Sequence, residues 1–162
     1  IMSDLYSCCS LVDEDEFFYT RGNSTFFTFP QPDSRRSPYC NIYLVQAIVH
    51  LSTGANKSLH IRSGVPATNV YSNDRKRLAI QGLLTTSGSN NHFTLGVEPN
   101  YPVRTASNFT TIEILIEDEL GDEIPIGDIT SINCLFRVDY LETNELRDEI
   151  LESYLPVNRL LN

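Results

Sequence analysis

Apolar and polar residues alternate along most of the chain between residues 24 and 141, and turn residues separate the alternating segments. The clearest case is the segment 131–141, where one side of an extended backbone carries Ile132, Cys134, Phe136, Val138 and Tyr140. Its other side carries polar residues, among them Asn133 and Asp139. Alternation with a period of two over this length predicts an antiparallel sheet with one face on the core and the other in water.

The same reasoning predicts a series of short strands. Gly82 interrupts one of them and marks a candidate β-bulge. In the longest segment the set Tyr43, Val45, Ala47, Val49 and Leu51 forms one apolar face, while Gln46 and His50 interrupt the other face. Seven or eight short strands separated by Gly, Pro and Asn are typical of a sandwich or barrel, and the uneven linkers favour a jelly roll. The predicted strands are 24–29, 42–51, 58–62, 78–84, 92–98, 111–117 and 131–141.

The segment 111–117 shows the expected arrangement of faces. Ile112, Ile114 and Ile116 fall on one side, and Glu113 and Glu117 fall on the side predicted to meet solvent. The acidic run 117–123 that follows lacks the spacing of alternate oxygens found in calcium loops. We interpret it as a charged hairpin tip, with divalent-ion binding between subunits as the alternative.

Three parts are predicted along the chain. Residues 1–24 are an irregular arm whose acidic half, residues 13–16, precedes the aromatic run 17–19. Residues 25–141 form the jelly-roll domain of an all-β, antiparallel sandwich. Residues 142–162 contain a short amphipathic helix that Pro156 ends, followed by a tail. The apolar stripe of that helix covers either an edge of its own sandwich or a neighbouring subunit.

Net charge and hydropathy limit the classes of partner that the chain is expected to bind. The formal net charge is −9, which repels phosphate backbones, so direct nucleic-acid binding is not expected. No run of about 18 apolar residues is present, so no membrane span is expected. The first residues lack the basic-then-apolar pattern of a signal peptide. The one basic cluster, 75–77, is either a solvated turn or a docking point for an acidic patch on a neighbour.

Candidate catalytic and metal-binding groups are sparse. His50, His60 and His92 are out of phase with the apolar residues of their strands, so they should point to solvent and not into a barrel. No G-x-S-x-G motif or glycine-rich phosphate loop is present. The four cysteines at 8, 9, 40 and 134 match neither a zinc pattern nor a disulfide framework. The sequence therefore predicts no enzyme, no cofactor and reduced thiols, with Cys134 as an inert core residue.

Three segments carry a resemblance to a known family: Tyr101-Pro-Val-Arg104, the run 108–125 (Asn-Phe-Thr-Thr-Ile-Glu-Ile-Leu-Ile-Glu-Asp-Glu-Leu-Gly-Asp-Glu-Ile-Pro), and Cys134-Leu-Phe-Arg137. They resemble the closing strands of jelly-roll capsid proteins of Polinton (Maverick) elements, adintoviruses and virophages. The likeness covers roughly residues 42–141. The acidic arm and the C-terminal helix have no counterpart in the family pattern.

The resemblance implies a structural virion protein. In this family the major capsid protein has two jelly rolls and forms trimers, whereas the minor protein has one roll and forms pentamers at the vertices. A chain with room for one roll is therefore expected to be of the penton type, or one roll of a major protein. Its expected partners are copies of itself, with a pentamer favoured over a trimer, and other capsid proteins. It is expected in the virion after assembly inside the host cell.

Charge complementarity suggests where copies would meet. Basic residues of one copy would face the acidic arm, or the acidic run 117–123, of the next, while the helix stripe would supply apolar contacts. The candidate interface residues are Arg35, Arg36, Arg75, Lys76, Arg77, Asp13, Glu14, Asp15, Glu16, Leu146, Ile150 and Tyr154.

Two other interpretations stay open. An extracellular lectin-like or cytokine-like sandwich would account for the glycosylation triplets at Asn23, Asn56 and Asn108, and a Cys40–Cys134 disulfide would favour it. A cupin-like enzyme would require a stoichiometric transition metal.

Overall fold

A computed structural model describes residues 3–10, 17–28, 37–54, 56–65, 78–96 and 102–141. These residues form ten β-strands and one turn of 3-10 helix, Ile126–Asp128. The strands are β1 (Ser3–Ser10), β2 (Phe18–Arg21), β3 (Ser24–Thr28), β4 (Tyr39–Leu51), β5 (Ser58–Gly64), β6 (Ala79–Ser87), β7 (Ser89–Leu95), β8 (Val103–Ala106), β9 (Thr111–Asp118) and β10 (Ile129–Tyr140).

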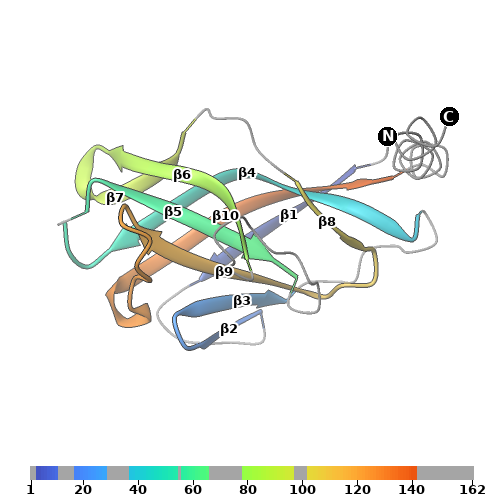
Figure 1. The fold of residues 1–162 in the computed structure, drawn as a ribbon, viewed down its shortest axis with the longest axis horizontal. Coiled ribbons are helices and arrows are strands. Elements are labelled where there is room, and N and C mark those ends of the chain that lie inside the picture. Colours follow the sequence, from blue (N-terminus) through green and yellow to red (C-terminus); the bar gives the residue numbers. More distant parts are fainter. Residues whose placement is uncertain are drawn as a thin grey trace, which may run out of the picture.

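The strands form two layers with jelly-roll connectivity. One layer, the β4 sheet, has the order β1-β10-β4, with β7 and β8 both paired to β4. The other, the β9 sheet, has the order β6-β5-β9-β3-β2. Figure 1 shows β5, β6 and β9 lying across β4, β10 and β1, and β7 joins the layers because it also pairs with β6. The chain passes back and forth between the sheets, which confirms the predicted all-β, antiparallel jelly roll.

The core lies between the two sheets and is made by side chains in alternate positions. On β9, Ile112, Ile114 and Ile116 face inward as predicted. The predicted inward set of residues 131–141 is also buried. Two facing apolar layers of this kind exclude water from the sandwich interior and supply most of the driving force for folding. Side chains with no exposed surface include Leu44, Ala47, Val49, Leu59, Ile61, Leu84, Phe93, Ile116, Phe136 and Val138.

A bulge in β4 corrects the predicted faces of that strand. Leu135 pairs with Gln46 and the next residue of β10 pairs with Leu44, so Val45 is the extra residue. The side-chain phase changes there: Leu44 and Ala47 are both buried, whereas Val45 is exposed. The apolar face predicted to run from Tyr43 through Val45 to Leu51 is therefore wrong in its first half.

A second bulge confirms the expectation at Gly82. Ile61 pairs with Gly82 and Arg62 pairs with Ile80, which leaves Gln81 as the extra residue of β6. Because of this bulge, Gln81 is buried next to a glycine instead of alternating to the outside.

The N-terminal region differs from the irregular arm predicted for residues 1–24. Residues 3–10 form β1, which pairs with β10, and residues 18–21 form β2, which pairs with β3. The inward positions of β1 include Cys8 and Ser10, and the Ser10 Oγ accepts a hydrogen bond from the Ile132 backbone N–H at 2.9 Å. The acidic residues 13–16, and the helix and tail predicted for 142–162, lie outside the described residues.

Candidate functional site

The predicted charged and apolar interface residues lie outside the part of the chain that the structure describes. This holds for all members of the proposed set: Asp13, Glu14, Asp15, Glu16, Arg35, Arg36, Arg75, Lys76, Arg77, Leu146, Ile150 and Tyr154. Of the proposed contact, the structure describes the acidic run 117–123.

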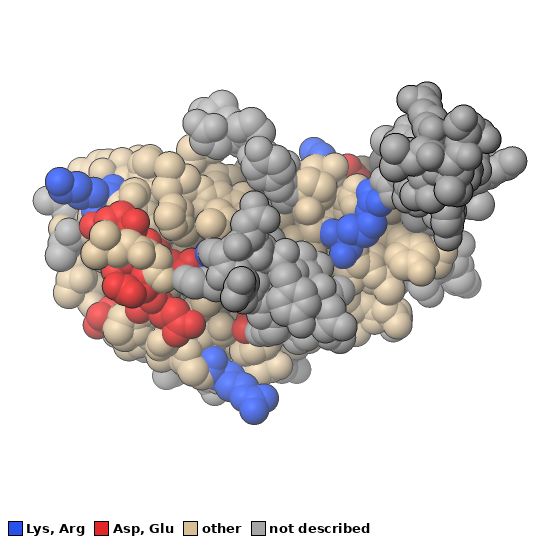
Figure 2. Space-filling model, viewed as in Figure 1, with Lys and Arg blue, Asp and Glu red and all other residues tan. Residues whose placement is uncertain are grey.

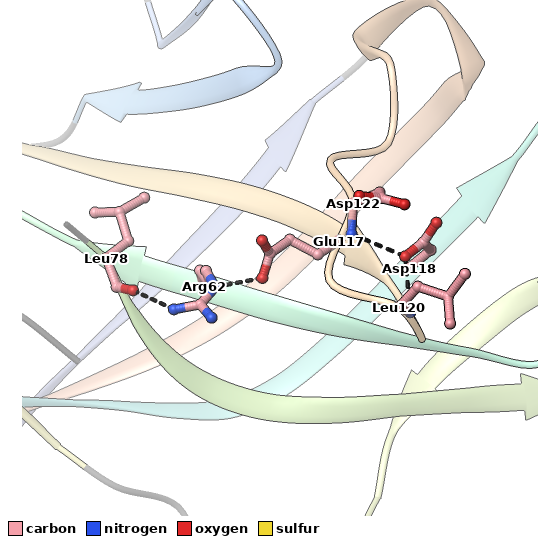
Figure 3. A network of polar contacts seen from close by, with 6 residues as sticks. All are labelled: Arg62, Leu78, Glu117, Asp118, Leu120 and Asp122. Carbon is pink, nitrogen blue, oxygen red and sulfur yellow. Dashed lines mark hydrogen bonds and ion pairs between the residues drawn. The ribbon is translucent and has the colours of Figure 1, made fainter. Parts of the chain in front are cut away.

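The acidic run contains one carboxylate that is used inside the subunit. Glu117 lies on the face of β9 that was predicted to meet solvent, yet its side chain is only 1% exposed and forms an ion pair with Arg62 of β5, itself 2% exposed. Figure 3 shows the two side chains pointing toward one another, with the Arg62 Nη1 donating to the Leu78 carbonyl oxygen at 2.7 Å. Glu113 on the same face is buried too. The prediction of a wet face on β9 is therefore wrong, and Glu117 cannot serve a contact between copies.

The remaining acidic residues form a tight turn after β9. The Asp118 Oδ1 accepts hydrogen bonds from the backbone N–H groups of Leu120 and Asp122 at 2.8 and 2.9 Å (Figure 3). Gly121 completes the turn with a φ of +86°, a conformation that favours glycine. The charged hairpin tip predicted from the sequence is confirmed.

This turn makes one end of the molecule strongly acidic. Figure 2 shows the acidic side chains gathered at that end of the sandwich. Glu119, Asp122 and Glu123 are exposed there, whereas Asp118 is half-buried by its own turn. Among the described residues, no group of three or more His, Cys, Asp or Glu side chains is placed to hold a metal ion. The exposed carboxylates instead offer a negative surface that a basic partner surface would complement.

Asn23, the first of the three glycosylation triplets, is tied to this acidic turn. Its Nδ2 donates to the Glu123 Oε2 at 3.1 Å, and its Oδ1 accepts from the Ile126 backbone N–H at 3.2 Å. The side-chain nitrogen to which a glycan would be joined is thus part of a contact between the β2–β3 turn and the segment before β10.

The three histidines lie on outer positions of the sheets, as their phase predicted, and each is half-buried. His50 and His92 are directly opposed on β4 and β7, with ring centroids 4.3 Å apart. His60 is on β5, where it pairs with Leu83 on one side and Glu117 on the other. The strand register therefore brings two of the histidines together and separates the third from them by β6.

A buried polar contact ties the two sheets together. The bulged Gln81 accepts a hydrogen bond from the Ser63 hydroxyl and donates its Nε2 to the Ile42 carbonyl oxygen of β4 at 3.2 Å. All three groups are in the interior, where an unpaired amide would be costly. Gln81 therefore links β5 and β6 of one sheet to β4 of the other.

The outer face of the β4 sheet carries an exposed apolar strip. Leu5 of β1 is 64% exposed and Val45 of β4 is 44% exposed. Tyr43 and Ile48 lie on the same outer face of β4, and Leu135 lies on β10 between β1 and β4, with Arg137 paired to both Leu5 and Tyr43. The Arg137 guanidinium lies 4.5 Å from the centre of the Tyr43 ring and donates its Nε to the Asp139 carboxylate at 3.0 Å. Sequence reasoning missed this strip because it assigned residues 1–24 to an arm and Val45 to the core.

The cysteines are all free, and three of them are buried. Cys8 and Cys134 are directly opposed on β1 and β10, whereas Cys40 pairs with Tyr140. Tyr140 is six positions along β10 from Cys134, or about 20 Å in an extended strand. A disulfide requires Cα atoms within about 7 Å, so the Cys40–Cys134 bond considered for an extracellular module does not fit this fold.

No family model, no curated protein and no solved structure matches this chain. Within the described part of the chain, no helix has the length and hydropathy that a membrane crossing requires.

Proposed function

We propose that this chain is a structural subunit that assembles with copies of itself, as a single jelly-roll capsid protein of the penton type. The pentamer is the favoured assembly, a trimer built from one roll of a major capsid protein is the alternative, and other capsid proteins are its further partners. The proposal places the chain in the virion, after assembly inside the host cell. It assigns the protein no catalytic role.

The observation that carries the proposal is the strand connectivity. The orders β1-β10-β4 with β7 and β8, and β6-β5-β9-β3, give two packed sheets in a double Greek key. This architecture recurs in viral capsids and lectins. The segments that resemble Polinton-type capsid proteins lie in β8, β9 and β10. β8 and β10 both pair with β4 in one sheet, and β9 lies between β3 and β5 in the other.

The outer face of the β4 sheet and the acidic turn after β9 supply surfaces for association. The apolar strip of Leu5, Tyr43, Val45, Ile48 and Leu135 lies on the outer face of the β4 sheet, where contact with a neighbouring subunit would remove it from water. An exposed apolar strip of neighbouring side chains is a common mark of a protein–protein contact. The acidic turn at the end of the molecule gives a second surface, suited to the basic residues 35–36 and 75–77 of a neighbour. Apolar packing would supply affinity, and charge would set orientation.

Matched aspartate variants test where copies meet. Leu5→Asp and Val45→Asp place a charge in the strip, whereas Leu83→Asp places the same charge on β6 of the other sheet, outside both proposed surfaces, where Leu83 is 37% exposed. We expect the first two variants to remain folded and to lose the assembled species in size-exclusion chromatography with light scattering. The Leu83 variant should assemble normally. Assembly that survives both strip variants would remove the strip from the contact.

Charge reversal tests the second surface. Arg75→Glu with Arg77→Glu should weaken assembly most at low salt, because screening at about 1 M salt reduces the Debye length to about 3 Å. Unchanged assembly at every salt concentration would remove the charge-complementary contact, while leaving the apolar strip as the basis of association.

A further inference from the structure

The pairing of β1 with β10 brings two thiols together across neighbouring strands. Cys8 and Cys134 occupy directly opposite positions, and both side chains face the core. Opposite residues of an antiparallel pair have Cα atoms roughly 4.5–5.5 Å apart. That separation is inside the range of about 4.4–6.8 Å found for disulfide-bonded cysteines. The Cα spacing therefore falls within the range of disulfide-bonded pairs, and a small approach of the two strands would bring the sulfur atoms into bonding distance.

The proximity of the two thiols affects their ionisation. Burial raises the pKa of the Cys134 thiol well above its ordinary value, and the nearby Cys8 raises it further. This Coulombic effect is the expected consequence of two ionisable groups placed close together in the interior by the strand register. Cys40 shows no such coupling, and strand register places it far from both.

The position of β1 gives a reagent access to the pair. Among the described strands, β1 hydrogen-bonds only to β10 and so forms the edge of the β4 sheet. An edge strand can separate locally without disrupting the rest of the fold, because it gives up a single ladder of hydrogen bonds. Such an opening exposes both Cys8 and Cys134, whereas Cys40 stays between β10 and β8.

We propose that Cys8 and Cys134 form a modification site at which a low-molecular-weight disulfide oxidises the two thiols to an intramolecular bond that fastens β1 to β10. The inference goes beyond the proposed function and requires no neighbouring copy. Its class of reactant is a small disulfide such as oxidised glutathione, which meets the pair when β1 opens.

The chemistry proceeds in two exchange steps. The Cys8 thiolate attacks one sulfur of the small disulfide, a protein–glutathione bond forms, and one glutathione thiolate leaves. The Cys134 thiolate then attacks the Cys8 sulfur, the protein disulfide forms, and the second glutathione thiolate leaves. The two protein thiols are oxidised, the glutathione disulfide is reduced to two thiols, and the two cysteine protons end on the released glutathione.

The bond would act on stability through the unfolded chain. Nearly the whole jelly roll lies between Cys8 and Cys134 in sequence, so the bond closes a long loop in the unfolded state. Closing a long loop removes much of its conformational entropy and raises the melting temperature. The opposed Cβ atoms of paired strands are slightly farther apart than those of a relaxed disulfide, so β1 must move inward and the bond should be readily reducible.

The test uses a Cys9→Ser, Cys40→Ser variant, in which only Cys8 and Cys134 remain, and a matched variant with the additional change Cys8→Ala. Each is incubated with oxidised glutathione, in buffer and in urea below the unfolding transition, where β1 opens more often. We expect the first variant to lose two hydrogen atoms in mass, to yield a linked Cys8–Cys134 peptide, and to gain roughly 5–15 °C in Tm. Dithiothreitol should reverse all three changes, and the matched variant should show none of them.

Two results would overturn the inference. One is the absence of the linked peptide under both conditions. The other is the accumulation of glutathione on both Cys8 and Cys134 without closure, which would show that the strands hold the sulfur atoms apart. Because the linked peptide and the glutathione adducts are detected on the individual chain, failure here leaves the proposed self-association unaffected, and failure of self-association leaves this test unaffected.

Discussion

Arg62 of β5 and Glu117 of β9 form an ion pair on the outer side of the β9 sheet, and both side chains are almost fully buried. The Arg62 guanidinium also donates to the Leu78 carbonyl oxygen at 2.7 Å. Buried charges are tolerated only when paired, because removal from water costs several kcal/mol for each ion. The pair therefore links two neighbouring strands and holds the segment before β6 against them.

Removal of one member of this pair should be strongly destabilising. Glu117→Ala leaves the Arg62 charge buried without this partner, and we expect the free energy of unfolding to fall by about 3–5 kcal/mol. The double variant Arg62→Met, Glu117→Leu should lose less than either single change, because it leaves neither member of this pair buried without the other. Urea denaturation of the three variants measures this, and additive losses would contradict the account.

A surface pair serves as the control. Arg137 bonds to Asp139, but its side chain is 42% exposed. Arg137→Ala should cost at most about 1 kcal/mol, since solvent screens an exposed pair.

The turn after β9 should depend on one carboxylate. Asp118 accepts two backbone hydrogen bonds, whereas the exposed Asp122 contributes only backbone groups to the turn contacts described above. Asp118→Ala should lower the free energy of unfolding by about 1 kcal/mol, and Asp122→Ala should have little effect. Equal effects from the two substitutions would show that the turn is held by its backbone alone.

A side chain at Gly82 should displace Leu95. A Cβ added there would overlap the end of the Leu95 side chain, whereas a Cβ added at Gly127 would meet nothing within 4 Å. Gly82→Ala should cost about 1–3 kcal/mol, and Gly127→Ala should be nearly neutral. Leu95→Ala should relieve part of the cost when combined with Gly82→Ala, so a double-mutant cycle with no coupling would argue against this packing.

Stability should also decline in alkaline solution because of the buried thiols. Burial raises the pKa of Cys8 from 9.0 to about 12, and the pKa of Cys134 also rises well above 9.0. Between about pH 9 and about pH 12 the unfolded chain releases these protons and the folded chain keeps them, so the free energy of unfolding falls as the pH rises. A Cys8→Ala, Cys134→Ala variant should show a shallower decline in urea denaturation, and identical slopes would contradict the assignment.

The sequence predicted those parts of the fold in which buried positions are apolar and alternate. β9 and β10 are the clearest, with inward Ile112, Ile114, Phe136 and Val138. β1 was missed because its signal is reversed: its inward positions include Ser10, which is satisfied by a hydrogen bond, while Leu5 faces outward. Only the distant partner strand β10 reveals which side of β1 is covered.

The predictions of which faces of β9 and β4 are buried were wrong for a related reason. Glu113 and Glu117 have the composition of a solvated face, and the burial of Glu117 depends on Arg62, which the sheet brings from 55 residues away. In β4 the phase changes at Val45 because of a bulge against β10, and no glycine or proline marks it. Pairing between strands that are distant in sequence therefore determines both the burial of Glu117 and the change of phase at Val45. The local alternation of apolar and polar residues carries no information about that pairing.

The exposed apolar strip on the β4 sheet follows from these two unforeseen features. Leu5 joins it because β1 is a strand, and Val45 joins it because of the bulge. The candidate interface predicted from charge and from the C-terminal stripe stays a prediction, except that Glu117 is withdrawn from it by its internal partner.

Native mass spectrometry of the purified full chain, at low and high salt, tests the proposed self-association most directly. The account predicts a closed assembly of defined mass, five chains for the penton type, that dissociates when Leu5→Asp or Val45→Asp is introduced. A trimer would assign the chain to the shell face instead. A chain that stays monomeric at every protein concentration and salt condition would contradict the account.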